Sequence, residues 1–330
     1  MVDIVVPVYN QEKYISQAIQ SILDQECNFN YRIIIGDDHS TDGTGKICKE
    51  FQNKYPERVL YIRNKENLGL AKNYQNVFSQ CTAKYIAILE GDDYWIDNQK
   101  LKKQVEILDS RPEVGLVHSG SYTLFENGVL KRSHLNVSIK LLDGDLYFSL
   151  LTKRNTVSPM TVCFRKSLFD TFVDFDFFVQ NDFKTIDYPL WLELAKHSKF
   201  AYIKEATAVY RNLSTSVSHK GTFEQRVSFF ETAQMTKLYY LRKYPVEGIT
   251  ERQLLSKIYK THFNLAVEFK RYDKAREIRE KLSLTDLESR LYYFFSSNIV
   301  LLRICRVWFN LKPALSSIKQ FVYKFYKKKL

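Results

Sequence analysis

Short apolar runs alternate with amphipathic segments through the first 110 residues of the chain. The apolar runs have the length and the β-branched content of buried strands, and they cover residues 3–8, 32–36, 59–62 and 85–89. Between these runs, apolar side chains recur at helical spacing, which predicts helices over residues 14–23, 47–51 and 71–78. Strands interleaved with helices of this length predict parallel strands joined by right-handed crossovers. The sequence therefore predicts an α/β fold with a doubly wound, mostly parallel sheet flanked by helices.

The pattern becomes mixed after this first section and then wholly helical. Strands are predicted over residues 114–124 and 157–164, and a short helix is predicted over residues 189–196, with a proline at its start. Beyond residue 222 the apolar spacing predicts helices over residues 230–242 and 254–269. We therefore expect a first domain over residues 1–221, followed by a helical C-terminal region over residues 222–330.

The composition indicates a globular protein with a sizeable core. Hydrophobic residues make up 45% of the 330 residues, which excludes intrinsic disorder, and 11 glycines with 7 prolines exclude a collagen-like chain. Five cysteines lie far apart without a Cys-x-x-Cys pair, so neither a zinc site nor a disulfide framework is indicated. They are typical of reduced, buried thiols in a cytoplasmic protein, and no signal peptide is expected before the first strand.

The formal net charge of +12 is concentrated at the C-terminus. From Ser289 to Leu330 there are nine basic residues and no acidic one, which leaves +3 for the rest of the chain. A nucleic-acid-binding protein would carry basic residues across its body, so we expect no nucleic-acid partner.

This basic tail, taken here as about residues 290–330, is also apolar and aromatic. Its longest run without a charge, residues 291–302, has 12 residues and is too short to span a bilayer, which needs about 20. After Pro313, apolar residues recur at helical spacing with lysines on the other faces, as in a helix that lies on an anionic membrane surface. The alternative is a helix that packs on the protein's own core with its lysines in solvent. The first interpretation predicts a peripheral protein on the inner, cytoplasmic face of the cell membrane.

Acidic side chains follow the second and the fourth predicted strands, as residues 37–38 and 90–93. The carboxyl ends of parallel strands share one edge of the sheet, where such folds bind ligands. Carboxylates gathered there repel each other unless a cation or a donor-rich ligand lies among them. Mg²⁺ and Mn²⁺ prefer such oxygen ligands and share them with substrate phosphates. The alternative for the first cluster is that residues 40–42 only cap the next helix.

Four segments in order carry a resemblance to a known family: VPVYN at residues 6–10, DDHSTDGT at 37–44, NLGLAKN at 67–73 and EGDD at 90–93. Over roughly residues 1–220 the chain resembles the family 2 glycosyltransferases, which are nucleotide-sugar-dependent enzymes with the GT-A fold. The resemblance implies an inverting transfer of a sugar from a nucleotide-diphospho-sugar, UDP-linked as the first expectation. The acceptor it implies is a hydroxyl of a lipid-linked glycan in bacterial cell-surface polysaccharide synthesis.

The resemblance also implies roles for particular residues in binding the donor. Pro7 and Tyr9 would line the base pocket, with the Tyr9 ring stacked on uracil or a related base. Asp38 would accept a hydrogen bond from N3–H of that base. Three more residues would approach the ribose and the diphosphate: Asn67, Gly69 and Lys72.

By the same resemblance, Asp92 and Asp93 match an Asp-x-Asp-type metal motif, with Asp93 as the direct ligand of Mn²⁺ or Mg²⁺. Glu90 stands where the family often has aspartate, and its role stays open. His219 ends a loop in which a family histidine joins the metal or diphosphate site, although a histidine in a polar loop is often only solvated. Arg211, earlier in that loop, is either a phosphate contact or a surface charge.

An inverting transferase needs a general base that deprotonates the acceptor hydroxyl. The segment TIDYPLWLEL at residues 185–194 resembles the part of the family that supplies it, which makes Asp187 the candidate. Ile186 departs from the family, where a second acidic residue is common, and Asp182 is the competing carboxylate. The alternative for Asp187 is a helix cap.

Two other classes of protein remain as alternatives. A sugar nucleotidyltransferase would carry a glycine-rich basic loop after the first strand, and residues 10–13 do not match one. A non-catalytic membrane-surface binding protein would have lost Asp93 or Asp187, and both are present.

Overall fold

Nine strands form one sheet in the computed structural model, which describes residues 1–133, 138–153, 155–181, 183, 185–213, 222–282 and 287–303. The chain divides into two compact units. The first comprises Met1–Ser216 together with Tyr239–Val246, and the second comprises Val217–Leu238 together with Glu247–Leu330. The sheet lies in the first unit.

The first half of the sheet is parallel, as predicted. Its strands lie in the order β3-β2-β1-β4 and are β1 (Val2–Val8), β2 (Tyr31–Asp37), β3 (Val59–Arg63) and β4 (Tyr85–Ile88). Every residue of β1 is buried, because helices cover both faces of this half. A strand that is covered on both faces is apolar throughout, which explains the continuous apolar runs in the sequence.

The second half of the sheet is mixed. It continues from β4 in the order β8-β6-β9-β5, with β7 paired to β6, and its strands are β5 (Tyr94–Trp95), β6 (Val114–Phe125), β7 (Leu130–Arg132), β8 (Cys163–Arg165) and β9 (Lys199–Asn212). Of its pairings only β6 with β9 is parallel. The strand predicted over residues 157–164 is wrong for its first part, where a 3₁₀ turn (Pro159–Thr161) precedes the short β8.

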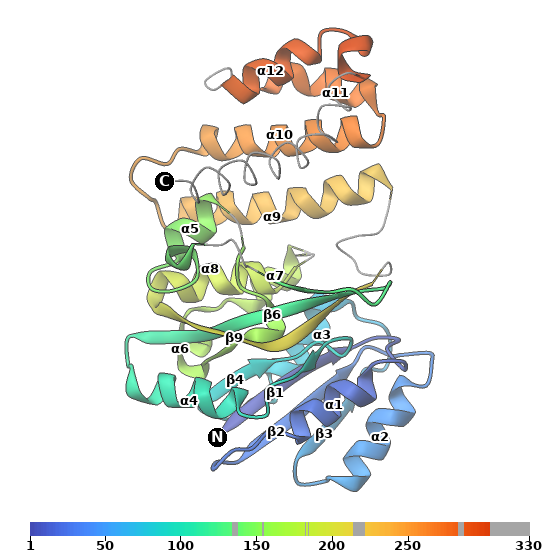
Figure 1. Ribbon diagram of the computed structural model, residues 1–330, viewed down its shortest axis with the longest axis vertical. Helices are drawn as coiled ribbons and strands as arrows, with labels where there is room; N and C mark the ends of the chain where they lie inside the picture. Colours follow the sequence, from blue (N-terminus) through green and yellow to red (C-terminus); the bar gives the residue numbers. More distant parts are fainter. Residues whose placement is uncertain are drawn as a thin grey trace, which may run out of the picture. The chain divides into compact units, whose positions relative to one another are not determined.

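Helices pack on both faces of the sheet (Figure 1). The α-helices described before residue 198 are α1 (Ile15–Leu23), α2 (Thr44–Lys54), α3 (Leu70–Phe78), α4 (Lys100–Ser110), α5 (Tyr147–Thr152), α6 (Lys166–Phe172), α7 (Phe175–Gln180) and α8 (Asp187–His197). The helices α1, α2 and α4 share one core cluster with the inward residues of β1 and β2. On the opposite face, α3 packs on β1 and β2. Aromatic rings there connect α3 to α6, α6 to β8, and β8 to α8.

The second unit is helical, as predicted. Its helices are α10 (Glu251–Glu268), α11 (Tyr272–Ile278) and α12 (Leu287–Phe295), together with most of α9 (Phe223–Lys243). Tyr292 and Leu302 are buried in its core, so part of the apolar stretch 291–302 packs within the protein. No helix among the described residues is both long enough and apolar enough to cross a bilayer. The rest of the basic tail, with the amphipathic helix expected after Pro313, lies outside the described residues.

Gly36 permits the close approach of α3 to β2. A Cβ at this position would lie 2.2 Å from Val77 Cγ2 and 3.0 Å from Asn73 Oδ1. We expect Gly36→Ala to lower the free energy of unfolding by about 1–3 kcal/mol, because the added methyl group overpacks this contact. Urea denaturation of the variant measures the loss. As a control, Val77→Ala removes the clashing methyl, so the double variant should lose less stability than the sum of the single variants. Strict additivity would contradict this account.

Candidate active site

Polar side chains from three neighbouring parallel strands meet at one edge of the sheet. The register pairs Val8 at the end of β1 with Asp37 at the end of β2, and β4 lies on the other side of β1. The segments that follow these strands therefore begin side by side. This is the edge at which the sequence predicted a ligand site.

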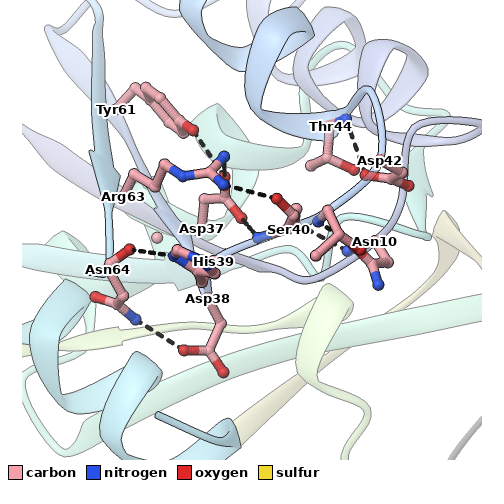
Figure 2. A network of polar contacts seen from close by, with 12 residues as sticks. Asn10, Asp37, Asp38, His39, Ser40, Asp42, Thr44, Tyr61, Arg63 and Asn64 are labelled. Carbon is pink, nitrogen blue, oxygen red and sulfur yellow. Dashed lines mark hydrogen bonds and ion pairs between the residues drawn. The ribbon is translucent and has the colours of Figure 1, made fainter. Parts of the chain in front are cut away.

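Asp37 stabilises the turn after β2 and is not available to a ligand. Its carboxylate is fully buried and accepts hydrogen bonds from Ser40 N at 2.8 Å and from Tyr61 Oη at 2.7 Å. Arg63 Nη1 forms an ion pair with it at 3.2 Å (Figure 2). The guanidinium also donates to Ser40 O at 2.8 Å, so Arg63 connects strand β3 to the turn after β2.

Asp38 organises the segment that leads into α3. One carboxylate oxygen accepts from Asn64 Nδ2 at 2.9 Å (Figure 2) and from Leu68 N at 2.8 Å, and the other accepts from Gly69 N at 2.9 Å. Asn67 Nδ2 donates to the main-chain oxygen of Asp38 at 3.2 Å. Three of the predicted donor-binding residues, Asp38, Asn67 and Gly69, are thus in direct contact. Gly69 has φ of +82°, a conformation that favours glycine.

The other predicted donor-binding residues lie around this segment. The Tyr9 side chain directly follows β1 and is 47% exposed, so its ring is free to stack on a base. Pro7 is buried within β1, and its carbonyl accepts from Gly91 N at 3.4 Å. Lys72 is exposed in the first turns of α3.

His39, in the turn after β2, has a left-handed backbone with φ of 63°. This conformation is costly for a residue with a Cβ. The ring nitrogen Nδ1 lies 3.2 Å from Asn64 O (Figure 2). Since a carbonyl only accepts, Nδ1 is the donor in this contact.

Glu90, at the end of β4, lies close to other carboxylates. Tyr74 Oη on α3 donates to Glu90 Oε1 at 3.2 Å. Burial raises the pKa of Glu90 to about 8, and the negative charges of Asp92 and Asp187 add to the effect. The side chain is therefore largely protonated at neutral pH in the absence of a cation. Its coupling to Asp187 brings the end of β4 and the start of α8 into one site.

Asp92 and Asp93 differ in accessibility. Asp92 is partly exposed, whereas the Asp93 side chain has no exposed surface. Asp93 Oδ1 accepts from Arg211 N at 2.8 Å, and its Oδ2 is buried without a hydrogen-bond partner among the described residues. Burial, reinforced by Asp92 and Glu90, holds the pKa of Asp93 well above its usual range. An uncompensated buried oxygen of this kind is costly, and a cation or a proton relieves the cost.

Arg211, at the end of β9, is an internal anchor rather than a surface charge. It is 8% exposed, and its guanidinium donates to the Asp92 carbonyl oxygen and to Gln17 Oε1. It lies over the rings of Tyr94 at 4.5 Å and Tyr14 at 5.0 Å. Through these contacts Arg211 holds the turn after β4. They account for its buried position without a bound phosphate.

Asp187 is the first residue of α8, and Ile186 is the N-cap. Its Oδ2 accepts from Asn155 Nδ2 at 2.9 Å. Burial raises the pKa of Asp187 to about 6, opposed by hydrogen bonds from the Tyr188 main chain and the Asn155 side chain. A carboxylate with a pKa of about 6 is ionised at neutral pH and is more basic than an ordinary aspartate, which suits a general base.

The first turn of α8 is held from several directions. Tyr188 Oη donates to Leu150 O at 2.7 Å, and Trp191 Nε1 donates to Val157 O at 3.2 Å. Further along the helix, buried Glu193 forms an ion pair with Lys243 at 2.9 Å and accepts from Tyr244 Oη at 2.6 Å. Asp187 therefore projects from a helix whose position is strongly determined.

A sequence profile described as "Glycosyl transferase family 2" matches residues 3–172, just over half of the chain. The chain belongs to this family. A relative in Mycobacterium tuberculosis, "Uncharacterized protein Rv1520", is 32% identical over 224 residues, which are 68% of this chain and 62% of the relative. The chain thus spans less than two thirds of that relative's length. The Escherichia coli protein "UDP-Glc:alpha-D-GlcNAc-diphosphoundecaprenol beta-1,3-glucosyltransferase WfgD" is 26% identical over 256 residues, 76% of this chain and 94% of the relative.

Solved structures of glycosyltransferases share the fold. Staphylococcus aureus TarS 1–349 in complex with UDP has a TM-score of 0.59 at 16% identity and covers 94% of this chain and 91% of its own. Mannosyltransferase PcManGT from Pyrobaculum calidifontis, in complex with GDP-Man and Mn²⁺, has a TM-score of 0.53 at 15% identity, with 93% and 87% covered. The predicted fold class, a GT-A fold with a helical C-terminal region, is confirmed.

The oxygen donors at the edge of this family 2 fold are suited to a hard divalent cation. The partly exposed Asp92 and the unpartnered Oδ2 of Asp93 are neighbouring carboxylates, the ligand type that Mg²⁺ and Mn²⁺ prefer. Within the described residues no cluster of three or more metal-binding side chains occurs, so a cation would take its other ligands from substrate phosphates and water. His219, predicted as a further ligand, and Asp182, the competitor for the base, lie outside the described residues.

The sequence did not identify Asn155 or Tyr74 as parts of the site. Asn155 lies in a loop without a recognisable motif, and its partner Asp187 is 32 residues away. Tyr74 occupies a regular apolar position of α3, where a core side chain is expected, and only the contact of its hydroxyl with Glu90 reveals a polar role. Neither contact has a local sequence signal.

Proposed function

We propose that this chain transfers a sugar from a nucleotide-diphospho-sugar to a hydroxyl of a glycan acceptor, with inversion at the anomeric carbon. The observation that carries the proposal is the acidic end of β4, where Oδ2 of Asp93 is buried without a hydrogen-bond partner among the described residues beside the partly exposed Asp92. Asp187 at the start of α8 supplies a carboxylate with raised basicity, and its charge acts on Glu90. A base and an acidic, cation-suited edge in one site are what an inverting transfer to a hydroxyl requires.

In this proposal the donor nucleotide binds at the ends of β1 and β2. The exposed Tyr9 ring stacks on the base, and the Asn67–Gly69 segment, held by Asp38, approaches the ribose and the diphosphate. Lys72 supplies positive charge to the phosphates. A UDP-linked donor is favoured because TarS was solved with UDP and WfgD is named for UDP-Glc.

Asp92 and Asp93 would hold Mn²⁺ or Mg²⁺ in this site. A bound cation of this kind neutralises the charge that develops on a departing nucleoside diphosphate. The support is the unpartnered Oδ2 of Asp93 beside the partly exposed Asp92, together with the Mn²⁺ of the mannosyltransferase structure. The end of β9 keeps the pair in place through Arg211.

Asp187 acts as the general base. It takes the proton of the acceptor hydroxyl while the oxygen forms a bond to the anomeric carbon on the face opposite the diphosphate. The bond between that carbon and the diphosphate oxygen breaks, and the nucleoside diphosphate leaves. The Asn155 contact and the position at the start of α8 orient the carboxylate for this step.

The acceptor class we propose is a lipid-linked glycan in bacterial cell-surface polysaccharide synthesis. WfgD is named for an acceptor carried on diphosphoundecaprenol. The basic tail would hold the protein on the anionic inner face of the cell membrane, where such acceptors are displayed.

We expect Asp187→Asn to retain donor binding and to lose sugar transfer by at least about a hundredfold, because an amide does not accept the hydroxyl proton. In the unchanged protein, kcat/KM should fall about tenfold per pH unit below pH 6 and level off above it, since protonation removes the base. Isothermal titration with UDP and a radiolabelled transfer assay measure the two quantities. Asp170→Asn, an exposed carboxylate paired with Lys166, is the control. Near-normal kcat in Asp187→Asn would exclude this residue as the base.

We expect Asp92→Asn and Asp93→Asn each to raise the Mn²⁺ concentration required for donor binding by about tenfold or more, because each loses a negatively charged ligand. Thermal shift with UDP over a Mn²⁺ titration measures the change. Asp109→Asn, whose carboxylate pairs with Lys84 away from the predicted ligand edge, should behave like the unchanged protein. Donor binding that EDTA leaves unchanged would contradict the metal-binding role of Asp92 and Asp93.

For the tail, we expect glutamate substitution of four lysines, Lys324, Lys327, Lys328 and Lys329, to weaken binding to anionic vesicles at least about tenfold. Each basic residue near such a surface contributes about 1 kcal/mol. Co-sedimentation with phosphatidylglycerol vesicles measures the affinity. The control replaces four exposed lysines of the first unit, Lys46, Lys49, Lys131 and Lys140. Equal loss in both variants would attribute binding to net charge and not to the tail.

A further inference from the structure

The loop between α5 and the following 3₁₀ turn reaches the start of α8 through one amide side chain. Asn155 Oδ1 accepts from Val157 N at 3.0 Å, and Asn155 Nδ2 donates to Asp187 Oδ2 at 2.9 Å. A main-chain N–H only donates and a carboxylate only accepts, so the two contacts determine which end of the amide faces which partner.

A second contact between the same loop and the same helix keeps this amide in position. Val157 O accepts from Trp191 Nε1 at 3.2 Å, and Trp191 is fully buried. Asp187 and Trp191 are four residues apart, so they share one face of α8. The loop therefore contacts that face at two points one turn apart.

The titratable groups around Asp187 disfavour its charge. Burial is the main effect. The titratable side chains that interact with it from other elements are Glu90 after β4 and Tyr74 on α3, and from its own helix Tyr188. All of these are neutral or negative. The hydrogen bonds donated by the Tyr188 main chain and by the Asn155 side chain oppose them and stabilise the ionised carboxylate.

We propose that Asn155 is a positioning residue for the general base: it holds Oδ2 of Asp187 and leaves Oδ1 for the acceptor hydroxyl. This inference rests on the proposed base role of Asp187. It assigns a function to a loop residue that no motif of the sequence marks.

Two substitutions of Asn155 separate a role in catalysis from a role in the turn. Asn155→Asp keeps the oxygen that accepts from Val157 N but turns a second carboxylate oxygen toward Asp187. Asn155→Ala removes both contacts. If Asn155 acts through Asp187, the acid limb of the kcat/KM profile should move up by about half to one pH unit in Asn155→Ala. It should move up by about one to two units in Asn155→Asp, since two carboxylates then share the site.

At pH 7 these shifts correspond to a loss of less than about twofold for Asn155→Ala and of about two- to tenfold for Asn155→Asp, with UDP affinity unchanged. A role confined to the turn predicts the reverse order, with Asn155→Asp close to the unchanged protein, and that result would overturn the proposal. An unshifted acid limb in both variants would do the same. Because Asn155→Asp preserves the turn, the test remains decisive if Asn155→Ala folds poorly.

Asn127→Ala is the matched control. Asn127 Oδ1 accepts from Val129 N at 3.2 Å, the same turn contact two residues along the chain, in the hairpin between β6 and β7. Its pH profile should equal that of the unchanged protein. Asp187→Asn, measured beside these variants, separates the base role of Asp187 from the positioning role of Asn155. If it stays active, the base assignment itself fails, whereas an inactive Asp187→Asn with unshifted Asn155 variants overturns the positioning role alone.

Discussion

Carboxylates from two strand ends and one helix start are gathered at one edge of the sheet, and each is compensated in a different way. Asp37 is paired with Arg63, and Asp38 accepts three N–H groups. Glu90 has its pKa raised to about 8 by burial and by its acidic neighbours. The carboxylates with full internal compensation build the framework. The proposed metal ligand and base are less fully compensated: Asp93 has one oxygen without a partner among the described residues, and Asp187 accepts from one side-chain donor among them.

The parallel half of the sheet was predictable because its strands are covered on both faces. β1 is buried at every position, and such a strand has one continuous apolar signal. β9, the longest strand, was not predicted, because its buried and exposed positions follow no regular alternation and its pairing with β6 contains register shifts. Strand β5 has two residues and exists only through its pairing with β9. Strands β5 and β9 are defined by long-range pairing, which a local sequence pattern does not contain.

The same limit applies to the candidate site. The sequence placed Asp38, Asn67 and Gly69 in one binding region, and the structure brings them into contact because their motifs follow adjacent elements. It left Arg211 between a phosphate contact and a surface charge, since its true partners, the Asp92 carbonyl and Gln17, are 119 and 194 residues away. A charged side chain that serves as an internal anchor looks the same in sequence as one that binds substrate.

Contacts of α8, the helix that carries Asp187, explain why a later segment of the chain belongs to the first unit. Glu193 on α8 is 1% exposed, and its charge is balanced by Lys243 and by the hydroxyl of Tyr244. Both partners come from the segment Tyr239–Val246, which belongs to the first unit although it follows part of the second. Removing one partner of a buried ion pair costs about 3–5 kcal/mol, and less where, as for Lys243, the partner is partly exposed. A unit cut at residue 221 would therefore lose the positive charge that pairs with Glu193 on α8, the helix that carries the proposed base.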